Sequence, residues 1–193
     1  AIISSDIGNN CAIGNAYPTF EQGRKYLAPG LFGPCGYGLP SIIGAKIGCP
    51  NSPVVGFAGD GAFGIAVTEL TAIGREEWPP ITMIVFRNYQ WGAEKRNSTL
   101  WYEDNFVGTE LDTSVSYAGI AQACGLKGVQ AKTMDELRDM LDKAIVDQMQ
   151  NGTTTLIEAM INQELGEPFR RDAMKKPVAV AGISINDMKP QTV

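Results

Sequence analysis

The amino-acid sequence predicts an α/β fold in three layers, with a parallel sheet of six strands covered by helices on both faces. Short apolar runs rich in β-branched residues alternate with segments of helical periodicity, as in parallel sheets buried on both faces. The chain of 193 residues is 44% hydrophobic and 19% charged, which suits one compact domain with a continuous core.

Six segments have the length and composition of strands. They are Ala1–Ser4, a short segment at Lys25–Ala28, Val54–Ala58, Ile81–Arg87, Lys127–Ala131 and Thr154–Ile161. Four segments between them have a helical pattern, namely Leu39–Gly48, Ile65–Gly74, Val115–Cys124 and Met134–Gln150. The last is the clearest, because Thr133 and Glu136 have the spacing of a capping box and Asn151-Gly152 supplies a stop.

Two stretches lack these patterns. Residues 88–114 have no strong period and are rich in Asn, Gly, Trp and Tyr, which is typical of a functional loop. Past Leu165 the chain shows no convincing element and becomes basic. We therefore expect a domain over residues 1–164 and a C-terminal extension over 165–193.

Composition excludes several classes of function. A net charge of −5 argues against binding to a nucleic acid backbone, and the absence of His removes His-based nucleophilic and metal sites. The four Cys form no CxxC pair and predict reduced thiols in a cytoplasmic protein. No apolar run reaches the roughly 20 residues of a membrane span. Because the chain begins directly in an expected strand, we expect it to be a piece of a longer polypeptide.

Ligands of open parallel sheets bind at the carboxyl ends of the strands. The segments that follow four expected strands are rich in glycine and in amide or carboxylate oxygens. They are Asp6-Ile7-Gly8-Asn9-Asn10, the glycines of 30–38, Gly59-Asp60-Gly61-Ala62-Phe63, and Asn88-Tyr89-Gln90-Trp91-Gly92. Because all four segments share one edge of the sheet, this edge is the candidate site.

Gly59-Asp60-Gly61 suggests a cation bound beside a diphosphate. Its glycines allow close approach of a ligand, and the N-terminus of the following helix favours an anion. Asp60 tolerates that anion only with a cation between them, and Mg²⁺ takes such ligands together with phosphate oxygens. Asn88 offers a second oxygen and Gln90 a backbone carbonyl. An ordinary tight turn is the alternative.

A dinucleotide site is a second alternative. Gly36, Gly38 and Ser41 nearly match the dinucleotide fingerprint, and Asp60 follows at about the distance of its ribose-binding acid. The match fails at Ser41, and Asp60 lies between glycines at the start of its own helix. A non-catalytic interaction domain is a third alternative.

The spacing from Gly59-Asp60-Gly61 to Asn88 resembles the diphosphate and magnesium motif of thiamine-diphosphate-dependent enzymes. The glycine cluster 33–38 and Glu69-Leu70 are also similar to their C-terminal cofactor-binding domain, as in acetolactate synthases. Within the family, residues 32–50, 85–101 and 162–177 look most like the branch that converts a sulfonated aldehyde and phosphate into acetyl phosphate and sulfite. The resemblance implies the thiamine-diphosphate-binding fold.

The resemblance also implies roles for individual residues. By this resemblance, Mg²⁺ is expected to be bound by the side chains of Asp60 and Asn88 and the carbonyl of Gln90. Thiamine diphosphate is expected to be bound by these and by Asn9, Asn10, Gly33, Cys35, Gly59, Gly61, Ala62, Phe63 and Gly92, of which Gly33, Cys35, Gly61, Ala62 and Phe63 use their backbone. Cys35 replaces the Met that wedges the cofactor in related synthases, and Arg87 replaces the first Asn of the usual Asn-Asn pair.

No residue of this chain is assigned a catalytic role. In the family, the catalytic Glu lies in an N-terminal pyrimidine-binding domain of the same or a partner chain, so this chain alone is expected to be inactive. The resemblance further implies a homodimer or homotetramer. The substrates it implies are a sulfonated aldehyde or 2-oxo acid together with phosphate, with neither nucleic acid nor membrane as a partner.

Overall fold

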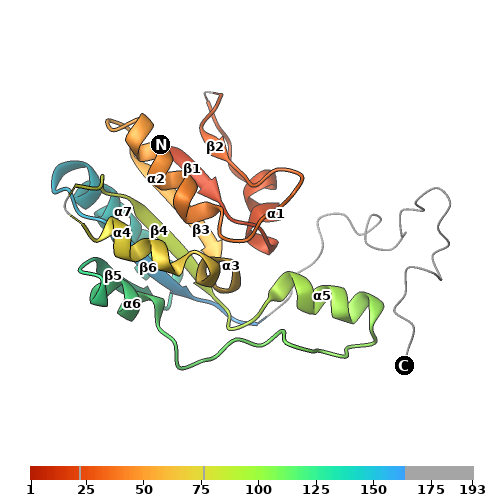
Figure 1. Cartoon of the computed structure of the whole chain (residues 1–193). Helices are drawn as coiled ribbons and strands as arrows, with labels where there is room; N and C mark the ends of the chain where they lie inside the picture. The colour runs from red at the N-terminus through yellow and green to blue at the C-terminus, as the bar shows by residue number, and fades with distance from the viewer. Residues whose placement is uncertain (22, 76, 164–193) are drawn as a thin grey trace.

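The computed structural model describes residues 1–21, 23–75 and 77–163 and contains a single six-stranded sheet in that part of the chain (Figure 1). Its strands are β1 (Ile2–Ser5), β2 (Tyr26–Leu27), β3 (Val54–Gly59), β4 (Thr82–Arg87), β5 (Lys127–Ala131) and β6 (Thr155–Met160). They are all parallel, in the order β2-β1-β3-β4-β6-β5. The predicted fold class is confirmed. The extension expected at 165–193 lies outside the described residues.

Helices connect the strands. They are α1 (Asn9–Ala16), α2 (Gly38–Gly48), α3 (Asp60–Ile65), a 3₁₀ turn (Val67–Glu69), α4 (Leu70–Ile73), α5 (Gly92–Trp101), α6 (Tyr117–Ala123) and α7 (Met134–Gln150). The bounds of α7 agree with the prediction, and its Thr133 hydroxyl accepts a hydrogen bond from the Glu136 N–H at 3.1 Å. Within the described part of the chain, no helix has both the length and the apolar character needed to cross a bilayer.

Alternate side chains of the strands point to two separate clusters. Met83 of β4 packs with Leu39 of α2 and Leu70 of α4 in the main core. The side chain of the preceding Thr82 accepts a hydrogen bond from Gln148 of α7, and Ala144 of α7 packs with Ile157 of β6 in a second cluster. The sheet is therefore covered on both faces, as the alternation of strand and helix patterns predicts.

The helix expected over Ile65–Gly74 is wrong in its bounds. Helical structure begins at Asp60, whose carboxylate accepts the Gly61 N–H at 3.0 Å in the first turn. It is then interrupted at Ala66, where the backbone angles (φ −103°, ψ 9°) are not helical. The carboxylate that follows β3 thus lies within the first helical turn.

Helix α5 forms where the sequence predicts only a loop. Among its residues whose side chains are described, none is buried, and the helix extends away from the sheet (Figure 1). A helix that buries no face carries no apolar period, which explains why the pattern gave no signal. Helix α1 was also not predicted. It has only eight residues, NNCAIGNA, and no side chain caps its N-terminus, so its sequence lacks the usual signals of a helix.

Candidate cofactor site

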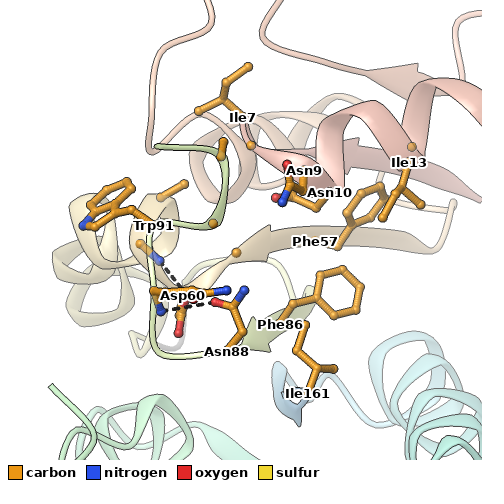
Figure 2. A pocket seen from close by; sticks show the side chains of 18 of the residues that line it. Ile7, Asn9, Asn10, Ile13, Phe57, Asp60, Phe86, Asn88, Trp91 and Ile161 are labelled. Carbon is orange, nitrogen blue, oxygen red and sulfur yellow. Dashed lines mark hydrogen bonds between the residues drawn. The ribbon is translucent and has the colours of Figure 1, made fainter. Parts of the chain in front are cut away.

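A cavity of about 590 Å³ opens at the carboxyl ends of β1, β3 and β4 (Figure 2). Its volume lies in the range of small-molecule binding sites. One wall is polar and comes from the segments after these strands. The other wall is apolar and includes Ile13, Phe57, Phe86 and Ile161. A ligand with a charged end and an apolar body matches this division.

Three amide side chains converge at one point of the polar wall. A Cβ atom built on Gly92 would lie 3.2 Å from Asn9 Nδ2, 3.5 Å from Asn88 Nδ2 and 3.8 Å from Gln90 Nε2. Asn9 follows β1, whereas Asn88 and Gln90 follow β4. The missing side chain at Gly92 therefore leaves open a space that amides from two strand ends surround.

The side chain of Asn10 is fixed from the protein side. Its Nδ2 donates to the Asp6 carbonyl at 2.8 Å and to Ser5 Oγ at 3.3 Å. Its Oδ1 would be 3.5 Å from a Cβ on Gly59, at the end of β3. Asn10 is thus bonded to the end of β1, and its side chain lies on the cavity wall near the end of β3.

The Asp60 carboxylate is held by three hydrogen bonds. Its Oδ1 accepts the Gly61 N–H at 3.0 Å, and its Oδ2 accepts Arg87 Nη1 at 2.9 Å and the Tyr89 N–H at 2.7 Å. Asp60 and Arg87 are both 1% exposed. Burial raises the pKa of Asp60, and the hydrogen bonds from Tyr89, Arg87 and Gly61 oppose that rise.

Asn88 and Gln90 stand beside Asp60 on the same wall (Figure 2 labels Asp60 and Asn88). Asn88 Oδ1 accepts only the Gln90 N–H, at 3.3 Å, among the hydrogen bonds of the described chain. Gln90 Nε2 donates to the Gln163 carbonyl at 2.9 Å, while its buried Oε1 has no partner within the described ranges. A buried acceptor without a donor indicates that something else completes this wall.

The oxygen donors on this wall suit Mg²⁺ better than they suit a metal ion coordinated by protein side chains alone. In the described part of the chain, no three Cys, Asp or Glu side chains gather as a metal site. The candidate donors are one carboxylate and neighbouring amide or carbonyl oxygens. Mg²⁺ commonly takes one or two protein ligands of this kind and completes its shell with phosphate oxygens and water.

The glycine-rich segment before α2 is bound by an internal carboxylate. Asp6 accepts the N–H groups of Gly36 at 3.1 Å and Gly38 at 2.7 Å, in addition to that of Ile7 at 2.8 Å. The N–H groups that a dinucleotide phosphate would need are therefore already used. The same contacts place the exposed Cys35 on the cavity wall, where partial desolvation raises the pKa of its thiol.

The structure brings most of the expected site residues to this one cavity. Those on its wall are Asn9, Asn10, Cys35, Gly59, Asp60, Gly61, Ala62, Asn88, Gln90 and Gly92. Phe63 is not on this wall: its fully buried ring packs edge-on against Tyr117 in the core, which leaves its backbone, the part expected to approach the diphosphate. Gly33 is not on the wall. A Cβ atom built on it would lie 3.1 Å from the side chain of Ile7, which is a wall residue.

Three contributors to the site had no role assigned from the sequence. Phe57, Phe86 and Ile161 have the same sequence pattern as buried strand residues. The sequence therefore does not distinguish residues of the apolar cavity wall from residues of the hydrophobic core. Asp6 gave a signal only as a carboxylate after β1. Arg87 was noted as a substitution for Asn, and that unusual charge in a buried strand end was the available signal.

Comparison with known proteins agrees with this geometry. The sequence matches the family described as thiamine pyrophosphate enzyme, C-terminal TPP binding domain, over residues 6–159. Sulfoacetaldehyde acetyltransferase of Roseovarius nubinhibens is 82% identical over 193 residues, which are 100% of this chain and 32% of that protein. The acetolactate synthase large subunit of Buchnera aphidicola subsp. Schlechtendalia chinensis is 26% identical over 162 residues, which are 84% of this chain and 28% of that protein.

A solved structure has the same fold. It is a thiamine diphosphate-dependent 4-hydroxybenzoylformate decarboxylase of Rhodococcus jostii RHA1, with a TM-score of 0.73 and 23% identity, covering 86% of this chain and 30% of that chain. The chain spans about a third of the length of the curated relatives it matches. The expected likeness to the family and to its acetyltransferase branch is confirmed. With a family match over residues 6–159, the chain belongs to the thiamine pyrophosphate enzymes, as their C-terminal TPP-binding domain.

Proposed function

We propose that this domain holds thiamine diphosphate through Mg²⁺ at the cavity between β1, β3 and β4. The observation that carries the proposal is the placement of the Asp60 carboxylate and the Asn88 amide on one wall. Their strands are neighbours, and the Tyr89 N–H ties the segment after β4 to Asp60 at 2.7 Å. Two side chains that carry oxygen donors, 28 positions apart in sequence, thus line one cavity, which supports the proposal that they share one cation.

Each residue has a definite task in this proposal. Asp60 and Asn88 bind the cation by their side chains, and Gln90 binds it by its carbonyl oxygen. Of the remaining residues, Asn9, Asn10, Cys35, Gly59, Gly61, Ala62 and Gly92 line the cavity and hold the cofactor or leave space for it. Gly33 and Phe63, which do not line it, contribute backbone only. When bound, thiamine diphosphate supplies the nucleophilic carbon that adds to a carbonyl substrate.

We infer that the complete enzyme converts sulfoacetaldehyde and phosphate into acetyl phosphate and sulfite. The 82% identity to a sulfoacetaldehyde acetyltransferase along the whole chain supports this substrate over the 2-oxo acid of a carboligase like acetolactate synthase. Sulfite release against acetolactate formation by the complete enzyme separates the two.

The rest of the enzyme supplies what this chain lacks. Because the chain is about a third of its relatives, we place the catalytic Glu in a pyrimidine-binding domain outside it. We accordingly propose that residues 1–164 form the cofactor domain, that 165–193 form an extension, and that the domain is inactive alone. A homodimer or homotetramer in the cytoplasm completes the proposal.

Calorimetric titration of the complete enzyme with thiamine diphosphate, with and without Mg²⁺, tests the site. Asp60→Ala should lose the Mg²⁺-dependent part of the affinity, whereas Asp135→Ala, an exposed carboxylate of α7, should keep it. Unchanged Mg²⁺-dependent affinity in Asp60→Ala would overturn the proposal. A thermal shift with NAD in place of thiamine diphosphate would instead favour a dinucleotide module.

A further inference from the structure

The carboxylate of Asp60 has unequal oxygens. Each carboxylate oxygen offers two lone pairs in the carboxylate plane. On Oδ2, both are taken, by Arg87 Nη1 at 2.9 Å and the Tyr89 N–H at 2.7 Å. On Oδ1, the Gly61 N–H takes one, at 3.0 Å. One lone pair of Oδ1 is therefore left for a cation.

The Arg87 guanidinium is fixed by more than its bond to Asp60. Its Nη2 donates to the carbonyls of Asp112 at 2.6 Å and Val115 at 3.0 Å. Its central carbon lies over the rings of Tyr89 and Tyr117, 4.2 and 5.2 Å from their centroids. A planar donor held on several sides keeps its direction when a ligand arrives.

A second carboxylate completes this arrangement. Glu158 Oε1 lies 3.6 Å from Arg87 Nε in an ion pair whose side chains are both 1% exposed. Glu158 is itself bound by Ser116 Oγ at 2.9 Å and Gln130 Nε2 at 2.8 Å. Arg87 thus stands between two buried carboxylates, Asp60 on the cavity wall and Glu158 beside Ser116 and Gln130, and removing it would leave both without their cation.

We propose that Arg87 is a positioning residue that restricts Asp60 to one-oxygen coordination and thereby favours Mg²⁺ over Ca²⁺. This inference rests on the proposed cofactor site. Mg²⁺ requires a near-octahedral shell of six oxygens, whereas Ca²⁺ accepts six to eight and often takes both oxygens of one carboxylate. By occupying Oδ2, Arg87 withholds the second oxygen. Its positive charge also keeps a cation on the Oδ1 side, where the distance between the two positive charges is greater.

The test compares Mg²⁺ and Ca²⁺ titrations of the complete enzyme in the presence of thiamine diphosphate. Loss of the positive charge in Arg87→Met should strengthen the binding of Mg²⁺ and of Ca²⁺ to the same extent. The informative quantity is therefore the ratio of the two affinities. We expect that ratio to move about tenfold toward Ca²⁺. Arg87→Lys, which keeps the charge and one donor, should restore part of the preference for Mg²⁺.

Glu158→Gln is the matched control. It changes the other buried partner of Arg87 and leaves the Arg87–Asp60 bond, so its ratio should equal that of the wild type. An unchanged ratio in folded Arg87→Met would overturn the inference. Absence of cation-dependent cofactor binding in the wild type would instead overturn the proposed function.

A measurement on the wild type decides the matter if Arg87→Met fails to fold. In a crystal structure of the complete enzyme with cofactor and Mg²⁺, Asp60 Oδ1 should be the ligand and Arg87 Nη1 should remain bonded to Oδ2. Coordination through Oδ2, or through both oxygens, would contradict the inference.

Discussion

The Asp6 carboxylate accepts the backbone N–H of Gly38 at 2.7 Å, across 32 positions of sequence. Asp6 directly follows β1 and is fully buried, while Gly38 is the first residue of α2. The Gly36 N–H donates a second hydrogen bond to the Asp6 carboxylate and fixes the turn that precedes α2. The loop that carries Cys35 to the cavity wall is therefore anchored by one side chain from a different strand end.

Asp6→Ala should release this loop and weaken cofactor binding. Two backbone N–H groups lose their charged acceptor, which costs about 1–3 kcal/mol for each buried group left unpaired. In the complete enzyme we expect faster amide hydrogen exchange in a peptide covering residues 33–38 and about tenfold weaker binding of thiamine diphosphate. The exposed Asp135→Ala should change neither. Unaltered exchange in Asp6→Ala would show that the loop does not depend on this anchor.

The sequence predicted the edge of the sheet at which the cavity lies, because each strand could be placed and each was followed by residues of the same kind. β4 is an apolar run that is followed directly by Asn88, and β3 is one that is followed directly by Asp60. In a parallel sheet, these ends must lie at one edge. Local composition was sufficient for this conclusion.

What the sequence could not give were pairings between distant side chains. Asp6 and Gly38, or Asp60 and Arg87, carry no pattern that links one to the other before the strand order is known. Helix α5 was missed for a related reason, since it buries no face among its described side chains and so shows no apolar period. Hydrophobic periodicity predicts neither long-range contacts nor exposed helices.

Gly61→Ala should disturb the polar wall through Trp91. A Cβ on Gly61 would lie 2.7–2.9 Å from three atoms of the Trp91 indole ring, well inside van der Waals contact. The ring must move, although alanine otherwise favours a helix by about 1 kcal/mol. We expect altered tryptophan fluorescence and about tenfold weaker cofactor binding in the complete enzyme.

Gly44→Ala provides the matched control for this substitution. Gly44 lies in α2, and a Cβ there would have nothing within 4 Å. This variant should gain about 0.5–1 kcal/mol of stability and bind cofactor as the wild type does. Equal fluorescence and affinity in Gly61→Ala and the wild type would contradict the expected displacement of Trp91.

Gln148→Ala should destabilise the fold without touching the cofactor site. This buried side chain of α7 accepts the Val54 N–H at 2.8 Å, and its Nε2 donates to the Val54 carbonyl at 2.8 Å and to Thr82 Oγ1 at 2.9 Å. It therefore pairs with the first residue of β3 much as a neighbouring strand would. Unpaired backbone groups and a cavity together cost about 3 kcal/mol.

Urea unfolding of the complete enzyme measures this loss, with Gln150→Ala on the exposed side of the same helix as the control. Cofactor affinity of folded Gln148→Ala should equal that of the wild type. A stability within 0.5 kcal/mol of the wild type would mean that the bonds to Val54 contribute little.

Asp147 should make stability depend on pH through Lys127. The Lys127 ammonium lies 2.7 Å from Asp147 Oδ2, and Asn151 Nδ2 donates to Oδ1 at 3.0 Å. These bonds, that of Lys127 first, hold the pKa of Asp147 below its ordinary value of 3.8. A carboxylate whose pKa is lower in the folded state stabilises that state above the ordinary pKa and loses the effect as pH falls through its folded value.

Asp147→Asn should thus be less stable than the wild type at neutral pH, and the difference should shrink as pH falls below 3.8. Urea unfolding between about pH 7 and pH 3 follows the difference, with Asp142→Asn on the exposed face of α7 as the control. A difference that persists undiminished to the lowest pH would show that the ionised form of Asp147 is not what the fold requires.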